Sequence, residues 1–332
     1  MATVVILYDG TDITEHVVYG QTNFTSQAGG QPGSCNVVID NRNHDFGPGY
    51  FTAGKTIELF VNGAREWDGW VFVATQGWPF PVDETTVPAG VPTRITLAGY
   101  DRNILFQKRI IYRLDNPIDS AGLKAWPQGT WDKTALNYVM NNYVDLSDDG
   151  LTIQIKHVGS PGPYEAFTLG YVGAPMGLAF EDASKMTGAV YFIDPSRVLR
   201  YVGDTDVTAP FALSDAPTGS QVGYRELSAV LDGTKLANEA RVWGAGKGSS
   251  TPVFAKYKDN SSVNTYGLWQ WGNLYMGAYK QKTVDRRAET YVEGSPSHRR
   301  GHGAPVPSVK CTIFEPGIRA GHVVDFHADT YG

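Results

Sequence analysis

Cysteine, basic charge and long apolar runs are all scarce in this sequence of 332 residues. The two cysteines, Cys35 and Cys311, are too few for a disulfide framework and lack the C-x-x-C spacing of zinc or redox sites, although a single pairing between them stays open. No stretch reaches the roughly 18 apolar residues that a membrane helix needs, so no stable membrane insertion is expected. The net charge of -6 does not supply the broad basic surface of a dedicated nucleic-acid-binding protein. We expect a globular chain that is made and folded in a reducing cytoplasm.

Sequence motifs of the common enzyme classes are also missing. The chain contains no G-x-S-x-G elbow, no H-E-x-x-H helix and no protease signature. The glycine-rich run at residues 244–249 fails as a phosphate loop because Arg241 stands where the first glycine is needed. The acidic run at residues 40–45 fails as a calcium loop because Arg42 occupies the third ligand position, so a polar loop between strands is expected. We therefore expect no enzyme activity, no catalytic residue, no cofactor and no metal.

A histidine-rich stretch near the carboxyl end invites a metal-site interpretation. His298 and His302 are four residues apart, and Cys311, His322 and His327 follow. Zinc sites on loops use closely spaced ligand pairs, and the glycines and prolines of this stretch oppose the helix that would align the two histidines. We favour a solvated loop.

Two charged clusters also have a functional and a plainer interpretation. The densest basic cluster consists of Arg286, Arg287, Arg299 and Arg300. A solvated or salt-bridged face explains this cluster better than a subunit or nucleic-acid contact. Glu66 and Asp68 would share a strand face and could form an acid pair for glycoside hydrolysis, but we favour two exposed acids beside Trp67 and Trp70.

The first third of the chain is patterned as a β-protein. Alternating or β-branched runs separated by turn-forming residues predict strands at residues 3–8, 17–24, 34–39, 56–61, 67–75 and 94–98. The strongest local signal is Asn62-Gly63, because an Asn-Gly step accepts φ > 0 at both central residues of a tight hairpin turn. Closely spaced strands of this kind indicate a small antiparallel barrel or sandwich at residues 1–112.

The middle third changes to a mixed α/β pattern. The apolar residues from Leu136 to Tyr143 fall on one face of a predicted helix that Thr130 or Asp132 caps. A second helix is predicted at residues 175–186, because a proline stands in its first turn and a glycine follows its end. A hairpin is predicted directly after it, at residues 189–202.

The last third returns to strands. They are predicted at residues 239–243, 308–314 and 322–327, with a helix at 283–293. Residues 53–60 and 320–327 share Ala-Gly, an Ile or Val, an acid and a large apolar residue at matching positions, which is a faint two-copy echo. The predicted fold class is β-rich α+β. It has a first β-barrel or sandwich at 1–112, a mixed α/β region inserted at 113–222 and a second β-rich, barrel-like region at 223–332.

Three passages, taken in chain order, resemble one family. The first comprises the runs at residues 9–14, 33–41, 54–60 and 67–71. The second is Leu-Ala-Asn-Glu-Ala-Arg-Val-Trp-Gly at residues 236–244. The third comprises the runs at residues 262–267, 287–289 and 316–326, in which a Tyr-Gly pair precedes an Ala-containing helix and a Gly-initiated final strand. This order is similar to that of the tail hub proteins of long-tailed bacteriophages, also called baseplate hub or minor tail proteins.

The resemblance implies a structural protein of the virion. Two tail-tube-like barrels per chain would let a homotrimer present six similar units, so that a threefold ring stacks on a sixfold tube. The implied partners are the tail tube, the distal tail ring, the tape measure protein and the tail-tip fibre or spike proteins. The ring would join the tube to the tail tip and gate the transient passage of viral DNA, for which an acidic lumen is suited because it does not hold phosphates.

Two alternatives stay open. A distal tail ring protein would share the first barrel but form a hexamer. A carbohydrate-binding module or glycan-active enzyme would need an open aromatic platform, with or without paired carboxylates, and would bind glycans as a monomer. The chain has the 8 Trp and 18 Tyr that such a platform draws on.

Overall fold

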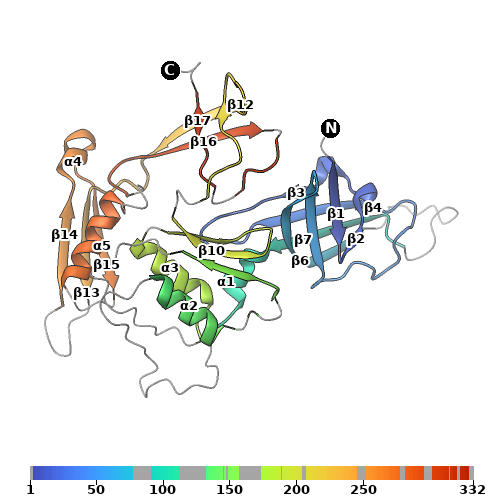
Figure 1. Cartoon of the computed structure of the whole chain (residues 1–332), viewed down its shortest axis with the longest axis horizontal. Coiled ribbons are helices and arrows are strands. Elements are labelled where there is room, and N and C mark those ends of the chain that lie inside the picture. Colours follow the sequence, from blue (N-terminus) through green and yellow to red (C-terminus); the bar gives the residue numbers. More distant parts are fainter. Residues whose placement is uncertain are drawn as a thin grey trace.

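The computed structural model describes residues 3–77, 91–111, 132–144, 146, 149–156, 173–187, 189–203, 207–244, 252–276, 281–294, 301–313, 315–319 and 322–328. Figure 1 shows an elongated molecule with a sheet of N-terminal strands at one end and a sheet from the last third of the chain at the other. A middle body of helices and strands lies between them. Within the described ranges, no helix is both long enough and apolar enough to cross a membrane.

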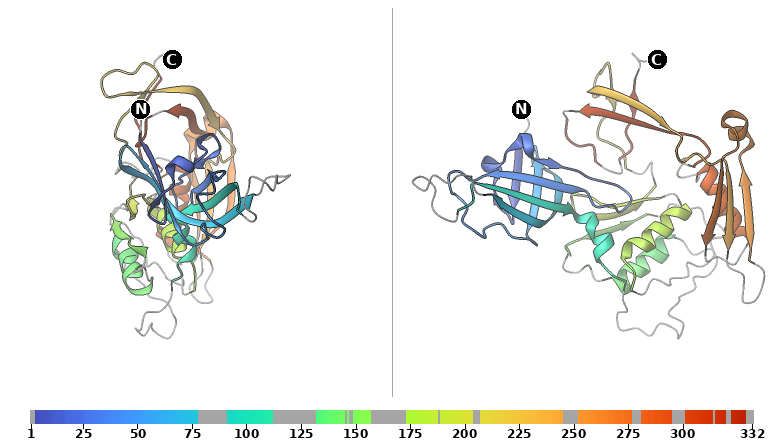
Figure 2. Two further views of the ribbon diagram at one scale, coloured as in Figure 1. Left: turned by 90° about the vertical axis from the view of Figure 1, so that its right-hand side faces the viewer. Right: turned by 180° about the vertical axis from the view of Figure 1, so that it is seen from behind.

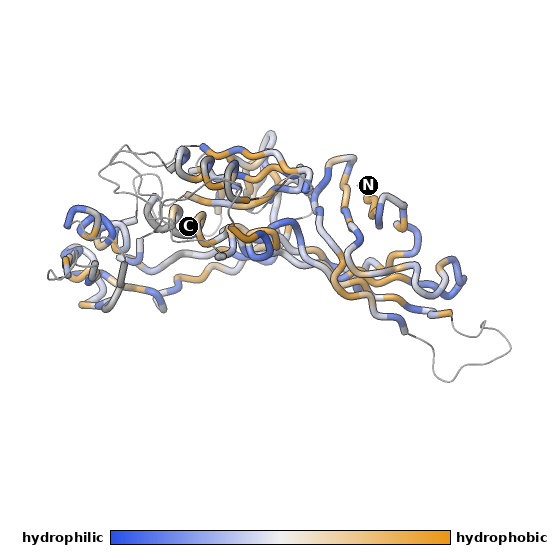
Figure 3. The backbone as a smooth tube through the Cα atoms, turned by 90° about the horizontal axis from the view of Figure 1, so that it is seen from below, coloured by the Kyte–Doolittle hydropathy of each residue, from blue (hydrophilic) through white to orange (hydrophobic). Residues whose placement is uncertain are grey.

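Seven antiparallel strands form the first sheet, in the order β2-β1-β5-β6-β7-β4-β3. They are β1 (Val4–Tyr8), β2 (Thr11–Asp12), β3 (Asn23–Phe24), β4 (Ser34–Asp40), β5 (Thr56–Val61), β6 (Ala64–Gly77) and β7 (Arg94–Asp101). Alternate residues of these strands, among them Ile57, Trp67 and Leu97, are buried in one core. Apolar positions accordingly recur along the strands without forming long runs (Figure 3).

The predicted strands of the first third are confirmed except at residues 17–24. The Asn62-Gly63 turn joins β5 to β6 with φ of 50° and 79°, as a tight hairpin turn requires. At residues 17–24 the strand prediction is wrong. Val17 makes only an isolated bridge, and a 3-10 turn over Tyr19–Gln21 precedes the two-residue β3. Gly20, in the centre of this run, has little strand propensity and gives the chain freedom to turn.

The prediction of a closed first barrel is not confirmed. Within the described residues the strand order ends at β2 and β3, which each contain two residues, and these two edges do not pair. Short edge strands present few free backbone groups, so an open sheet can end on them without inviting further strand pairing.

The middle body holds three strands and several short helices. They are α1 (Leu105–Lys108), α2 (Asp132–Tyr143), α3 (Met176–Thr187), β8 (Thr152–Ile155), β9 (Val190–Ile193) and β10 (Val198–Val202), with a 3-10 turn, η3 (Arg102–Ile104), ahead of α1. The two predicted helices and the predicted hairpin β9–β10 are confirmed. Leu136 and Val139 of α2 pack with Met176 and Phe180 of α3 in a second core. The strands run in the order β8-β10-β9, with β8 parallel to β10.

The last third forms two separate sheets. One runs β16-β12-β11-β17 and the other β14-β13-β15. The strands are β11 (Leu213–Ser214), β12 (Val222–Asp232), β13 (Glu239–Gly244), β14 (Phe254–Lys258), β15 (Gln270–Met276), β16 (Val306–Ile313) and β17 (Phe326–His327), and the helices are α4 (Asn260–Tyr266) and α5 (Gln281–Glu293). Val284, Ala288 and Val292 of α5 are buried, and the first two join Val242 and Ala255 of the sheet in a third core. The predictions of a helix at 283–293 and of a strand at 239–243 are confirmed, and the strand predicted at 308–314 is confirmed up to Ile313, the last of its residues that the structure describes.

β12 and β16 form a two-stranded arm, which lies on the opposite side of the middle body from α2 and α3 (Figure 2). Because the last third divides into this arm and a distant sheet, a second closed barrel is not confirmed in the described residues either. The echo between residues 53–60 and 320–327 does not extend to structure. β5 is a central antiparallel strand, whereas the later copy contributes only the short β17, which pairs in parallel with β11. The strand predicted at 322–327 is therefore wrong over most of its length.

Candidate functional site

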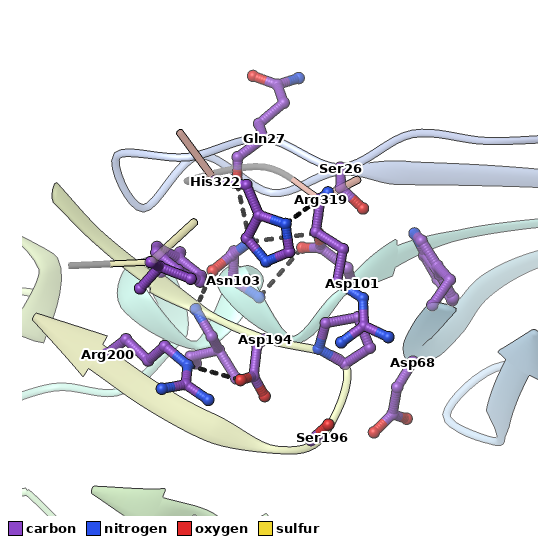
Figure 4. Close-up of a pocket in the computed structure, with 15 residues that line it drawn as sticks. Ser26, Gln27, Asp68, Asp101, Asn103, Asp194, Ser196, Arg200, Arg319 and His322 are labelled. Carbon is purple, nitrogen blue, oxygen red and sulfur yellow. Dashed lines mark hydrogen bonds and ion pairs between the residues drawn. The ribbon is translucent and has the colours of Figure 1, made fainter. Parts of the chain in front are cut away.

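A polar cavity of about 110 Å³ lies where the first sheet, the β9–β10 turn and a segment near the carboxyl end meet. Ion pairs and hydrogen bonds converge on its walls (Figure 4). The titratable side chains that line it are Asp68, Asp101, Asp194, Arg200, Arg319 and His322. These residues are up to 254 positions apart in the sequence. Tertiary packing, and not local sequence, therefore brings them together.

Asp68 stands at the centre of the buried ion pairs beside this cavity. Its fully buried carboxylate accepts from Arg102 Nε at 2.6 Å and from Arg197 Nε at 2.7 Å. Arg102, from η3, also donates to the backbone oxygen of Asp149 at 3.2 Å and lies 4.4 Å from the ring of Trp70. Buried charges are tolerated when each has an opposite charge and its hydrogen bonds are made. These contacts therefore connect the first sheet to the middle body.

Arg197 brings the β9–β10 turn onto the first sheet. Its backbone has φ of 65°, a conformation uncommon for a residue with a side chain, and its N–H closes the turn on the Asp194 oxygen at 2.9 Å. The guanidinium reaches Asp68 and also Glu58 Oε1, at 3.0 Å from Nη2. Glu58 in turn lies 3.1 Å from Arg65 Nε. We call Glu58, Asp68, Arg102 and Arg197 the junction.

Asn103 forms a second connection between the same two bodies. Its side-chain oxygen accepts from the Ile193 N–H at 2.6 Å, and its amide nitrogen donates to the Gln27 oxygen at 3.2 Å. The neighbouring Asp101 carboxylate accepts from Asn103 at both the backbone and the side chain. Burial raises the pKa of Asp101 to about 6, against the opposing effect of hydrogen bonds from Gly33 and Asn103.

Arg319 reaches the first sheet from near the carboxyl end. Its Nε and Nη2 lie 3.1 Å from the two oxygens of Glu66, and Nη2 also donates to the Arg65 backbone oxygen at 3.1 Å. His322 Nδ1 accepts from the Arg319 N–H at 3.3 Å. Burial, followed by the charges of Arg319 and Arg200, lowers the pKa of His322, so its imidazole is neutral at pH 7 and can accept this bond.

The prediction that Glu66 and Asp68 are both exposed is wrong. Asp68 is buried between two guanidinium groups, and Glu66 is held by Arg319. The reason is that the partners lie 34, 129 and 253 positions away along the chain, where no local pattern reveals them.

The other sequence candidates take plainer roles. His302 stacks on Tyr291, and the part of the chain that is described contains no group of three or more possible metal ligands. Cys35 and Cys311 are both free thiols. Asn41 is buried and donates to two backbone oxygens, and it lies in the polar loop that was predicted after β4. Arg286 pairs with Glu289, as a salt-bridged face requires.

Several of the predicted candidates lie outside the described residues. These are His298, Arg299, Arg300 and most of the glycine-rich run at 244–249. Conversely, the sequence did not single out Arg102, Arg197 or Asn103. The pattern Asp-Arg-Asn at the end of a predicted strand is a weak signal, and only the fold shows that these side chains turn inward.

The arm is the second notable feature of the surface. Val230 and Leu231 are adjacent on β12 and therefore point to opposite faces, yet they are 54% and 67% exposed. Val309 of β16 is also half-exposed, directly opposite Ala229. Neither face of the arm is therefore covered along this stretch. Beyond Val222 and Gly223, where β11 pairs with β12, the arm consists of two strands within the described residues, and a two-stranded ribbon is marginally stable in water without further contacts.

A second exposed apolar surface, after the arm, lies beside α4. Tyr266, Leu268, Trp269 and Trp271 are each between 41% and 54% exposed. Trp269 donates through its indole N–H to the Tyr266 backbone oxygen at 2.8 Å, and Trp271 lies 5.8 Å from the ring of Tyr291. Exposed aromatic groups of this size are more common in binding surfaces than on the rest of a protein.

No protein-family model matches the sequence, and no curated protein does either. Solved structures with a similar fold do exist. The 43 kDa tail protein of prophage MuSo2 from Shewanella oneidensis aligns with a TM-score of 0.64 and 12% identity, covering 100% of this chain and 90% of that one. A tail protein from Neisseria meningitidis MC58 gives 0.65 and 14%, covering 100% and 88%. Prophage tail protein gp18 from Listeria monocytogenes EGD-e gives 0.57 and 11%, covering 99% and 86%. The chain therefore shares, over nearly its whole length, the fold of these prophage tail proteins.

Proposed function

We propose that this chain is a structural protein of a bacteriophage tail, and that within the tail it is the hub at the tip. The observation that carries the proposal is the fold, which matches three prophage tail proteins along 99% or more of this chain. The cavity agrees with a structural role. Asp68 lines the cavity and holds Arg102 and Arg197, and Glu66 on the same strand holds Arg319, so these ion pairs fasten separate bodies together.

The arm supports assembly with other copies. Its exposed side chains at Val230 and Leu231 provide apolar area, and the outer edge of β16, beside which no described strand pairs, provides free backbone groups. In a ring, each arm would pack against the neighbouring copy, and the ribbon would gain the contacts that it lacks alone.

In the proposed hub, three copies close a ring that stacks on the tail tube. Residues 1–112 and 223–332 would supply two tail-tube-like units per chain, completed as barrels only in the ring, with residues 113–222 inserted between them. Six similar units would then meet a sixfold tube without unmatched contacts. The proposed partners are the tail tube, the distal tail ring, the tape measure protein and the fibre or spike proteins of the tip. The protein would be made in the host cytoplasm, and viral DNA would pass through the ring.

The solution mass of the purified chain, measured by light scattering and supported by electron-microscope class averages, tests this proposal. A trimer with a pseudo-sixfold outline is the expected result. A hexamer with true sixfold symmetry would replace the hub with a distal tail ring protein. A monomer that binds glycans in an array, through the patch at Tyr266, Leu268, Trp269 and Trp271, would contradict the hub and support a carbohydrate-binding module.

A further inference from the structure

Residues 315–319 and 322–328, which we call the strap, follow the arm strand β16 and lie between the arm and the first sheet. The later half of the strap is held by backbone hydrogen bonds. Val323 exchanges bonds of 2.8 Å with Val207 and Ala209, and the Leu213 N–H donates to the Asp325 oxygen at 2.8 Å. β17 then pairs with β11. This half belongs firmly to the sheet that carries the arm.

The earlier half contacts the first sheet through one side chain. Among the residues that the structure describes, every hydrogen bond between the strap and the first sheet comes from Arg319, on Glu66 and on the Arg65 backbone oxygen. Glu66 can bind Arg319 because it sits in a β-bulge. β5 pairs with Arg65 and with Trp67, which leaves Glu66 between them without a partner on β5.

The two connections to the first sheet differ in exposure. In the junction, the carboxylate of Asp68 is 0% exposed, and its partners Arg102 and Arg197 are 5% and 32% exposed. In the strap contact, those of Arg319 and Glu66 are 24% and 14% exposed. Water can therefore replace the strap contact at a lower cost in free energy than the junction contacts. A partly solvated ion pair contributes little to stability, whereas breaking a buried pair leaves a charge without solvent.

Gly317 provides a hinge two residues before Arg319. Its φ is 117°, a conformation that residues with a side chain rarely adopt, and a Cβ there would lie 3.1 Å from Pro210. On the other side of Arg319, the His322 N–H donates to the Arg319 oxygen at 3.0 Å while His322 Nδ1 accepts from the Arg319 N–H. The imidazole thus sets the direction of Arg319 toward Glu66, and the glycine allows the chain to turn there.

From this arrangement we propose that the strap is a releasable connection between the arm and the first sheet, closed by Arg319 on Glu66 and hinged at Gly317. When it opens, the junction keeps the first sheet attached to the middle body, while the arm and its sheet lose their direct hold on β6. The proposal concerns the single chain and does not depend on the tail assignment.

Trypsin digestion of the full chain tests the strap. Glu66→Gln removes the carboxylate but leaves Arg319 as a cleavage site, so release is measured as the rate of cut after Arg319, with fragments identified by mass spectrometry. Because cleavage follows the population of the open form, we expect about a tenfold faster cut at Arg319. Cuts at Arg102 and Arg197 should keep their wild-type rates, since the junction is intact.

Arg319→Lys keeps a trypsin site and the charge but loses the paired N–H donors, so it should also be cut faster at position 319. The matched control is Asp40→Asn, which breaks the exposed ion pair with Arg42 and should leave the cut after Arg319 unchanged. An unchanged rate at position 319 in both strap variants would overturn the proposal. Equal acceleration at Arg102 and Arg197 would overturn it as well, because Arg319 would then stabilise the whole molecule and not a separate strap.

Discussion

Asp68 is the residue on which the junction depends most, because one buried carboxylate neutralises two guanidinium groups. Asp68→Asn keeps the shape of the side chain and removes its charge. We expect a loss of about 3–5 kcal/mol in the free energy of unfolding, the usual cost of removing one partner from a buried ion pair. Urea unfolding followed by tryptophan fluorescence measures the loss. The control is Asp40→Asn, whose ion pair is exposed. A similar, small effect of both substitutions would contradict a central role of Asp68.

Asp101 gives a prediction for pH. Burial raises its pKa in the folded chain from the ordinary value of 3.8 to about 6. The folded state therefore binds more protons than the unfolded state between these values, and the contribution of Asp101 to stability falls as the pH rises through about 6. Asp101→Asn removes this dependence. The stability of the variant relative to wild type should rise between pH 4 and pH 7, as measured by urea unfolding at both values. A flat or falling difference would show that the Asp101 carboxyl is not perturbed.

At the scale of elements, the turn between β5 and β6 shows how local chemistry defines a hairpin. Gly63 has φ of 79°, and a Cβ there would meet no atom within 4 Å, so Gly63→Ala would test backbone strain alone. We expect a loss of about 1 kcal/mol in stability, from the left-handed conformation of alanine. Gly47→Ala is the matched control, since Gly47 has equally open surroundings and no positive φ. Equal unfolding midpoints for the two variants would refute this account.

Elements were predictable from the sequence where the signal is local. The Asn62-Gly63 step, the apolar face of α2 and the proline and glycine that bound α3 each depend on neighbours within a few residues, and each prediction was confirmed. β12 was missed because its residues are largely exposed on both faces and show no alternation. Whether a sheet closes into a barrel could not be predicted from the sequence either, because closure depends on how strands distant in the chain pair.

The site was less predictable than the elements. Glu66 and Asp68 were recognised as a pair, but their surroundings were predicted wrongly, since Arg102, Arg197 and Arg319 lie 34 to 253 positions away. Ion pairs between distant segments leave no periodic pattern in a single sequence. The fold of the whole chain is therefore needed to see that these acids connect bodies and do not face solvent.

At the scale of the whole molecule, the uncovered arm makes the assembly testable by one substitution. Leu231 is 67% exposed, so Leu231→Lys should change the unfolding midpoint of the single chain very little, as is usual for surface substitutions. If copies meet through the arm, a buried lysine without a partner would oppose the contact, and the mass by light scattering should fall from that of the ring to that of one chain. Leu231→Met keeps an apolar group of similar size and should preserve the ring. A ring that survives Leu231→Lys at equal protein concentration would place the contact elsewhere, because an interface centred on this side chain cannot keep its affinity after burying an unpaired charge.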